Sequence, residues 1–209
     1  ALIPTDATGG SPVRAGPAPR LSHTLRLRRA SGQWRATLAR MTDYSYHVAT
    51  DADLPALTDI YNAAIIRGGS TADTEPVTTK QRKAWLDSFQ TPYAVFVIDA
   101  GAGDTAEPIG FAAISAFNPR PGYDGICSLA YYITPQWQGR GAGKYALGVL
   151  IDECRARAMR MACTVIFADN AASSGLMERF GFTRYGLLPQ AAYDSKGTLH
   201  DVGFWSYAL

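Results

Sequence analysis

Apolar residues downstream of residue 43 recur three and four positions apart in four segments, the spacing that places them on one face of a helix. The predicted helices begin near Leu54, follow Thr78, and span residues 141–158 and 170–180. Residues of the types that cap helices stand at their ends: Thr50 or Asp51, Thr78, Asn170 and, at the C-terminal end of the last helix, Gly181. Trp85 and Phe89 are expected on the buried face of the second helix.

Short apolar runs bounded by turn residues predict the strands. One opens the region near His47, and the others are expected at residues 93–100, 109–117, 127–134, 161–168, 182–189 and 201–209. The turn-rich segment 101–108 predicts a hairpin between two of them. The order of elements, βααβββαβαββ, indicates a mixed α/β fold, and 209 residues with 47% hydrophobic content suit one domain with a sizeable core.

The first 40 residues differ from the rest in composition. They hold seven arginines, no lysine and a single acid, Asp6, for a net charge of +6. The remainder holds 13 basic and 17 acidic residues, net −4, which argues against a nucleic-acid-binding surface. We expect residues 1–42 to be a disordered leader, either a transit peptide or an upstream-translated stretch with the natural start at Met41, and residues 43–209 to be the folded domain.

Three cysteines, Cys127, Cys154 and Cys163, form no CxxC pair or other close spacing. The pattern therefore predicts neither a disulfide framework nor a zinc site, and no metal is expected. No apolar run reaches the ~18 residues of a membrane span. We expect a cytoplasmic protein in a reducing compartment, or an organellar one if residues 1–40 direct import.

The segment Gln138–Lys144 reads QGRGAGK and lies between a predicted strand and a predicted helix. A Walker A loop is excluded because Gly139 and Gly143 are one residue too close and Tyr145 replaces the required hydroxyl residue. A GxGxxG dinucleotide motif lacks its last glycine. The spacing fits a pyrophosphate loop of the form Q/R-x-x-G-x-G/A, with a glycine-softened turn that binds nothing as the alternative.

Helix geometry favours the pyrophosphate loop. The first turn of a helix leaves N–H groups without partners, and these donors, with the helix dipole, attract a phosphate. The glycines let the backbone approach closely, while Arg140 and Lys144 add positive charge.

About 27 residues beyond Gly143, the segment Asn170–Ser173 opens a short helix that Gly181-Phe182 closes. Loop and helix together resemble the GNAT superfamily of acetyl-CoA-dependent N-acetyltransferases, over about residues 44–209. Four stretches are similar to its phosphinothricin/methionine sulfoximine branch: IYNAAI (60–65), TADTEPVTTKQRKAW (71–85), FNPRPGYDG (117–125) and Asp201-Val202.

The resemblance implies a splayed, mostly antiparallel central sheet flanked by helices, with acetyl-CoA as cofactor between the splayed strands. Its pyrophosphate would lie on the glycine loop and its pantetheine arm would pair with the preceding strand. The cofactor-binding residues implied are Tyr132, Ile133, Thr134, Gln138, Gly139, Arg140, Gly141, Ala142, Gly143, Lys144, Asn170 and Ser173. For Asn170 a plain helix-capping role is the alternative.

Acetyl transfer needs a base for the acceptor ammonium, and here the sequence departs from related branches. Ser128 stands where they carry a glutamate, and Met177 stands where many carry a tyrosine or histidine. Three replacements are open: a water held by Ser128, the carboxylate of Asp124, or a tyrosine or His200. Tyr131 and Tyr132 alternate in direction along the strand, so only one of them faces the cofactor; Tyr132 is our catalytic candidate with Ser128 and Asp124.

The resemblance also places acceptor contacts. In the predicted loop before the fourth strand, Arg120 could clamp a carboxylate beside Tyr123, while Asp73, Glu75 and Arg82 lie in the segment that covers the acceptor pocket in this branch. We expect an N-acetyltransferase for a small primary amine, an amino acid or analogue, with a homodimer allowed by the resemblance. The alternatives are acetylation of a protein N-terminus or lysine, and a non-catalytic acyl-CoA-binding regulatory domain.

Overall fold

The computed structural model describes residues 44–101 and 106–209. The predicted leader over residues 1–42 lies outside the described residues, as does part of the hairpin turn at 102–105. The described part follows the predicted order of strands and helices.

Seven strands form one mixed sheet in the order β1-β2-β3-β4-β5-β7-β6. Their bounds are β1 Tyr44–Val48, β2 Ala94–Ala100, β3 Glu107–Ala116, β4 Ile126–Ile133, β5 Met161–Phe167, β6 Thr183–Tyr193 and β7 Leu199–Ala208. Every neighbouring pair is antiparallel except β4 and β5, which are parallel. The mostly antiparallel sheet expected from the sequence is confirmed, including the β2–β3 hairpin.

The four predicted helices are α2 (Leu54–Arg67), α3 (Thr79–Asp87), α4 (Ala142–Ala156) and α5 (Ala171–Phe180). The side chains of Thr78 and Asn170 accept hydrogen bonds from the first turns of α3 and α5, and Gly181 ends α5 with a left-handed φ of 84°, all as predicted. A short 3₁₀ turn, Asp51–Asp53, intervenes between the Thr50 cap and α2.

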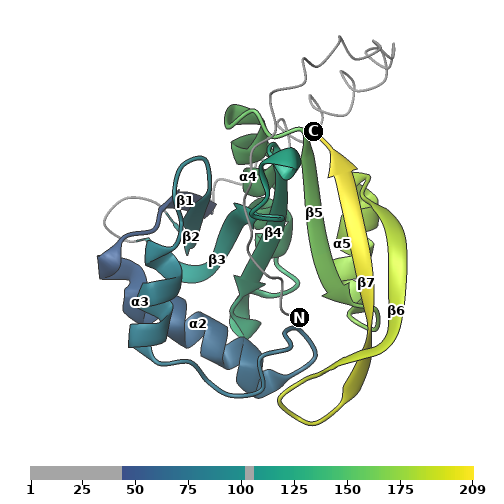
Figure 1. Cartoon of the computed structure of the whole chain (residues 1–209). Helices are drawn as coiled ribbons and strands as arrows, with labels where there is room; N and C mark the ends of the chain where they lie inside the picture. The colour runs from purple at the N-terminus through teal and green to yellow at the C-terminus, as the bar shows by residue number, and fades with distance from the viewer. Residues whose placement is uncertain (1–43, 102–105) are drawn as a thin grey trace, which may run out of the picture.

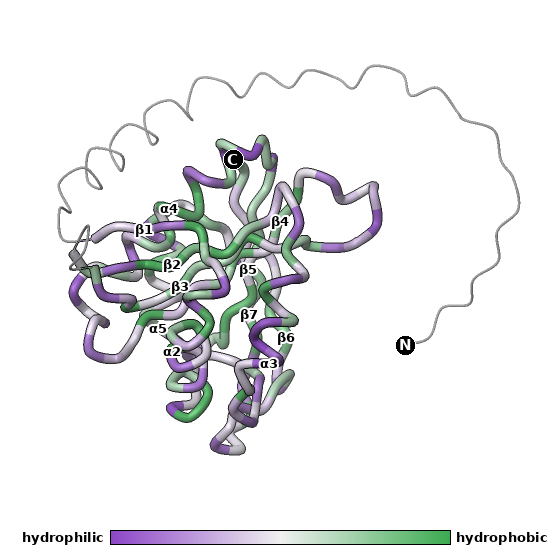
Figure 2. The backbone as a smooth tube through the Cα atoms, turned by 90° about the vertical axis from the view of Figure 1, so that its left-hand side faces the viewer, coloured by the Kyte–Doolittle hydropathy of each residue, from purple (hydrophilic) through white to green (hydrophobic). Residues whose placement is uncertain are grey.

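Helices cover both faces of the sheet. On one face, α2 packs on β3 and β4, and α3 packs beside α2 and against Phe111 of β3, over a core that includes Leu57 and Val97. On the other, α4 packs on the same strands over a larger core that includes Ile114 and Leu150. Because the central strands are covered twice, β2 and β3 read as continuous apolar runs, and Figure 2 shows the hydrophobic segments gathered along them.

The parallel pair β4–β5 is short. It pairs only Ile126–Ser128 with Met161–Cys163, after which β4 continues beside β3 and β5 continues beside β7. The Thr164 hydroxyl donates a 2.9 Å hydrogen bond to the Leu129 carbonyl directly after the last backbone pair. Beyond this point, called the fork below, the strands diverge, and Figure 1 shows β5, β7 and β6 leaning away from β4.

A second contact joins the two parts of the sheet at the open end of the fork. The loop between β6 and β7 reaches the C-terminal end of α2 (Figure 1). There the Gly69 N–H donates to the Asp194 carboxylate at 2.9 Å, and the Ser195 hydroxyl donates to the Ile65 carbonyl. From α5, the Asn170 amide donates to the Gly69 carbonyl at 3.4 Å. These three hydrogen bonds are called the tie below.

Cys127, Cys154 and Cys163 are free thiols and all three are buried, with 3.4 Å between the sulfurs of Cys127 and Cys154. Within residues 44–101 and 106–209, no helix has the length and apolarity needed to cross a membrane.

Candidate functional site

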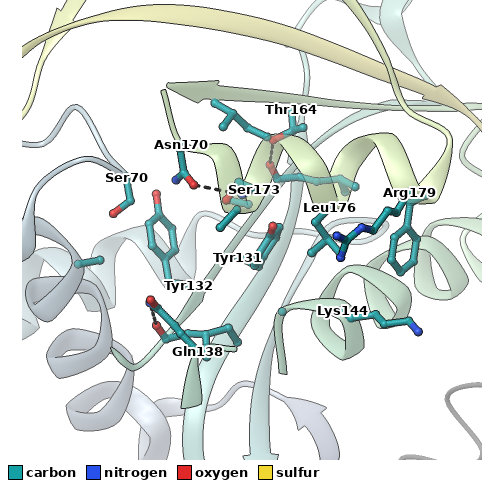
Figure 3. A pocket seen from close by; sticks show the side chains of 18 of the residues that line it. Ser70, Tyr131, Tyr132, Gln138, Lys144, Thr164, Asn170, Ser173, Leu176 and Arg179 are labelled. Carbon is teal, nitrogen blue, oxygen red and sulfur yellow. Dashed lines mark hydrogen bonds between the residues drawn. The ribbon is translucent and has the colours of Figure 1, made fainter. Parts of the chain in front are cut away.

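A cavity of about 760 Å³ occupies the fork. Figure 3 shows its side chains projecting from β4, from the α4 end of the glycine loop and from α5. Of the residues predicted to bind the cofactor, nine line it: Tyr132, Ile133, Gln138, Gly139, Gly141, Gly143, Lys144, Asn170 and Ser173. Three do not: Thr134 and Arg140 lie beside it, and Ala142 is wholly buried in the core.

The glycine loop owes its shape to two left-handed residues. Gly139 has φ 75° and Gly141 has φ 97°, a region that residues with a Cβ rarely adopt. Gly141 is also the N-cap of α4 and supplies no side-chain cap, unlike Thr78 on α3 and Asn170 on α5. The first N–H groups of α4 are therefore free of a side-chain acceptor at the edge of the cavity, where an anion can take that place.

Two cavity cations were missed from the sequence. Arg67, in the last turn of α2, donates to the Gln138 side chain at 2.6 Å, and Gln138 in turn donates to the Ile133 carbonyl at 2.9 Å. Arg179 reaches the cavity from the end of α5. With Lys144 they make one end of the cavity positive, although each is a single exposed residue on a helix and gives no motif to read.

Helix α5 presents Ser173 and Leu176, three residues apart, to the cavity. Asn170 has the capping role, accepting from the Ser173 N–H at 3.1 Å, and its side chain also lines the cavity. Met177 is 1% exposed and belongs to the core. Its position therefore faces away from the cavity, which is why a non-ionisable residue is accommodated there.

The two adjacent tyrosines point to opposite faces of β4. Tyr131 packs toward α4 and α5, where its hydroxyl hydrogen-bonds with Ser173, while Tyr132 packs on the α2 face against Tyr61 and Phe111. Burial raises the pKa of both phenols. Both rings line the cavity, and Figure 3 shows the Tyr132 hydroxyl turned toward Ser70 and Asn170. The expectation that only one would face the cavity is therefore wrong.

The three catalytic candidates do not converge. Ser128 forms the last backbone pair before the fork and does not line the cavity. Asp124 is exposed in the loop before β4. At about 3.3 Å per residue, Asp124 and Tyr132 are on the order of 25 Å apart along the strand. Asp124 and Tyr132 therefore cannot act on one nitrogen atom.

His200, the further alternative for a base, is 5% exposed. Its Nδ1 lies 2.8 Å from the Asp169 carboxylate and its Nε2 lies 3.3 Å from that of Asp194, and the ring stacks on Phe167 with centroids 4.2 Å apart. His200 is neither exposed nor part of the cavity lining. Because it contacts Asp194, which accepts the Gly69 hydrogen bond, we infer that it supports the tie.

The predicted acceptor contacts fall in two places. Asp73 and Glu75 are exposed in the connection between α2 and α3, whereas Arg120 and Tyr123 are exposed at the other end of β4. Arg82 is 4% exposed, with its guanidinium 4.0 Å from the Tyr61 ring centroid. The prediction that Arg82 contacts the acceptor directly is therefore corrected. Aromatic rings cover its guanidinium, so Arg82 supports the side chains around it instead.

The cavity fits a long ligand with an anionic end and an amide-bearing arm. The positive end has glycines, uncapped helix donors and cations for a pyrophosphate. The other part runs along Leu129–Ile133 of β4, whose backbone edge has left β5 and is available to pair with the amides of a pantetheine arm. These are the features that acetyl-CoA requires.

Comparisons with known proteins agree with this geometry. Residues 47–183 match the family model of the acetyltransferase (GNAT) domain. An L-methionine sulfoximine/L-methionine sulfone acetyltransferase from Pseudomonas aeruginosa is 34% identical over 142 residues, 66% of this chain and 80% of the relative. A phosphinothricin N-acetyltransferase from Streptomyces coelicolor is 34% identical over 138 residues, 65% of this chain and 80% of the relative.

A crystal structure of a phosphinothricin acetyltransferase from Sinorhizobium meliloti in complex with acetyl-CoA superimposes with a TM-score of 0.72 at 27% identity, covering 81% of this chain and 89% of that one. The matched residues 47–183 contain the glycine loop and both strands of the fork. The chain therefore belongs to the GNAT acetyltransferase family and is an N-acetyltransferase that takes its acetyl group from acetyl-CoA and passes it to the amine of a small molecule.

Proposed function

We propose that the acceptor is the α-amine of an amino acid or a close analogue, such as methionine sulfoximine or phosphinothricin. The observation that carries the proposal is the acceptor class named for the two relatives above, each 34% identical to this chain and covered over 80% of its length. The small side chain of Ala130 supports it, since it leaves the β4 surface between Ser128 and Tyr132 open beside the cavity.

Acetyl-CoA supplies an activated acetyl thioester. In our assignment the chain holds its pyrophosphate with the glycine loop and the first N–H groups of α4, while Lys144, Arg67 and Arg179 offset the charge. The β4 backbone beyond Leu129 orients the arm so that the thioester lies near the fork. We assign Asn170 and Ser173 to the opposite wall, where their polar atoms lie beside this arm.

The acceptor must lose a proton before it attacks, because only a neutral amine is nucleophilic. Ser128 is assigned to hold a water molecule near the fork and not to take the acceptor's proton, since a serine hydroxyl is no base near neutral pH and Ser128 does not line the cavity. Tyr132 is assigned to contact the acceptor amine from the α2 face. For exposed polar groups of the acceptor we propose Asp73 and Glu75. Arg120 and Tyr123 lie at the other end of β4 from Tyr132 and therefore cannot bind the carboxylate of an amino acid whose amine contacts Tyr132.

A coenzyme A release assay tests the acceptor class. L-Methionine sulfoximine, phosphinothricin and L-methionine are compared with their N-acetylated forms and with a peptide that begins with alanine. Turnover of the free amino acids alone supports the proposal, whereas turnover of the peptide alone overturns it in favour of a protein acceptor. If calorimetry shows acetyl-CoA binding and every amine fails, the chain is a binding module.

A further inference from the structure

The cavity contains no side chain that can accept the acceptor's proton at neutral pH. Of the described residues that line it, none is a carboxylate or a histidine, and its ionisable groups are cations and tyrosines. A proton released beside β4 must therefore be passed to an acceptor outside the cavity.

A chain of hydroxyl groups leads out from Tyr132. Its hydroxyl hydrogen-bonds with Tyr61 and Thr71. The Tyr61 hydroxyl lies 3.1 Å from the Thr71 hydroxyl and donates a 2.7 Å hydrogen bond to the Asp73 carboxylate. Asp73 is exposed to solvent, whereas Tyr132 lines the cavity. The hydroxyl groups between them therefore connect the cavity with solvent.

Arg82 fixes the middle of this chain. Its guanidinium lies over the Tyr61 ring at 4.0 Å and over Trp85 at 4.5 Å, and Tyr61 meets Tyr132 edge-on at 4.9 Å between ring centroids. Arg82 Nε and Nη2 are buried with no hydrogen-bond partner among the described residues. The guanidinium is thus held by aromatic faces beside Tyr61 and Asp73. Its positive charge attracts the Asp73 carboxylate, which is the solvent end of the row of hydroxyl groups.

We propose that Tyr132, Tyr61 and Asp73 form a proton relay that carries the acceptor's proton from the cavity to solvent. The inference rests on the proposed function. Tyr132 is then a catalytic residue, because it contacts the acceptor, while Tyr61, Asp73 and Arg82 act through it as relay and positioning residues.

The protons balance as follows. The acceptor ammonium has three: one passes to the Tyr132 oxygen while the Tyr132 hydroxyl proton moves to Tyr61 and the Tyr61 proton moves to Asp73, which releases it to water. The neutral nitrogen then forms the C–N bond to the acetyl carbon as the C–S bond breaks. Of the two protons left on nitrogen, the amide keeps one and the leaving thiolate of coenzyme A receives the other. Neither tyrosine carries a net charge at the end, so their raised pKa values do not oppose the transfer.

Tyr61→Phe breaks the relay and keeps the aromatic ring under Arg82. With L-methionine sulfoximine as acceptor, we expect kcat/KM to fall about 100-fold at pH 7, the usual size of general acid–base effects. The loss should shrink as the pH approaches the pKa of the amine, since the substrate then arrives already neutral. A purely structural role would lower the rate by the same factor at every pH. Tyr193→Phe, which removes an exposed hydroxyl from β6, is the matched control and should leave the profile unchanged.

Asp73→Asn should reproduce the Tyr61→Phe profile, and Asp73→Glu should restore part of the rate. Asp59→Asn, an exposed carboxylate on α2, is the control for charge alone. Calorimetric titration with acetyl-CoA should give the same Kd for every variant, which separates the relay from cofactor binding. Rates within twofold of the unmodified protein for both Tyr61→Phe and Asp73→Asn overturn the relay alone. No turnover by the unmodified protein overturns the proposed function and the relay together.

Discussion

Replacing Thr164 with valine removes the hydrogen bond that the Thr164 hydroxyl donates to the Leu129 carbonyl at the fork. Both residues are buried, at 8% and 5% exposure, although they border the cavity, so water replaces the lost donor only in part. Leaving a buried acceptor without its donor costs about 1–3 kcal/mol. The added methyl group returns up to about 0.8 kcal/mol. We therefore expect the free energy of unfolding to fall by about 1–2 kcal/mol.

Urea unfolding at 25 °C measures this loss directly. In a thermal melt the same change should lower Tm by about 2–8 °C for a domain of this size. Thr164→Ser keeps the hydroxyl and should retain more of the stability than valine, whereas Thr183→Val on the exposed face of β6 should have little effect. If Thr164→Val is as stable as the unmodified protein, or less damaging than Thr164→Ser, the hydrogen bond does not hold the fork and the argument is refuted.

Three further predictions concern the loop, its helix and the tie. Lys144→Glu should weaken acetyl-CoA binding about tenfold or more in calorimetry, because it reverses a cavity charge, and Arg140→Glu should have a smaller effect because Arg140 lies outside the cavity over Trp137. Gly141→Ala should lower the free energy of unfolding by about 1–2 kcal/mol, since φ is 97° there, while Gly175→Ala in α5 should be neutral or stabilising; equal effects would contradict the strain argument. Burial alone would raise the pKa of the Asp194 carboxyl. Hydrogen bonds from the N–H groups of Thr198, Lys196 and Gly69, with the contact to His200, outweigh burial and hold this pKa at about 2, below the ordinary 3.8. This stabilisation is therefore present above pH 3.8 and lost as the pH falls toward 2, so Asp194→Asn should unfold in urea with a weaker dependence on pH across that window.

The elements could be predicted because each is encoded locally. The caps at Thr78 and Asn170 and the period of apolar residues specify helices without reference to the rest of the chain. The glycine loop was equally readable, since its backbone conformation requires glycine at fixed positions. The predicted helix over 141–158 ends slightly early, at Ala156, because the chain turns at Ala158 with φ 56°.

What could not be predicted depends on contacts between elements. Arg82 reads as a surface residue of an amphipathic helix, yet Tyr61 from α2 and Phe111 from β3 cover it. From the local pattern His200 likewise reads as a loop residue, yet the carboxylates of Asp169 and Asp194 enclose its ring. Tyr61, Phe111 and Asp169 are 21 to 31 residues away from the side chain that each contacts, so they leave no signal in the local pattern.

The tie changes what kind of opening the fork is. Backbone pairing joins β4 and β5 at one end, and the hydrogen bonds of Gly69 and Asp194 join the same two parts of the sheet at the other. An opening fastened at both ends cannot widen like a hinge. A ligand therefore enters and leaves across the side of the fork, and not through the end that the hairpin loop and α2 hold closed.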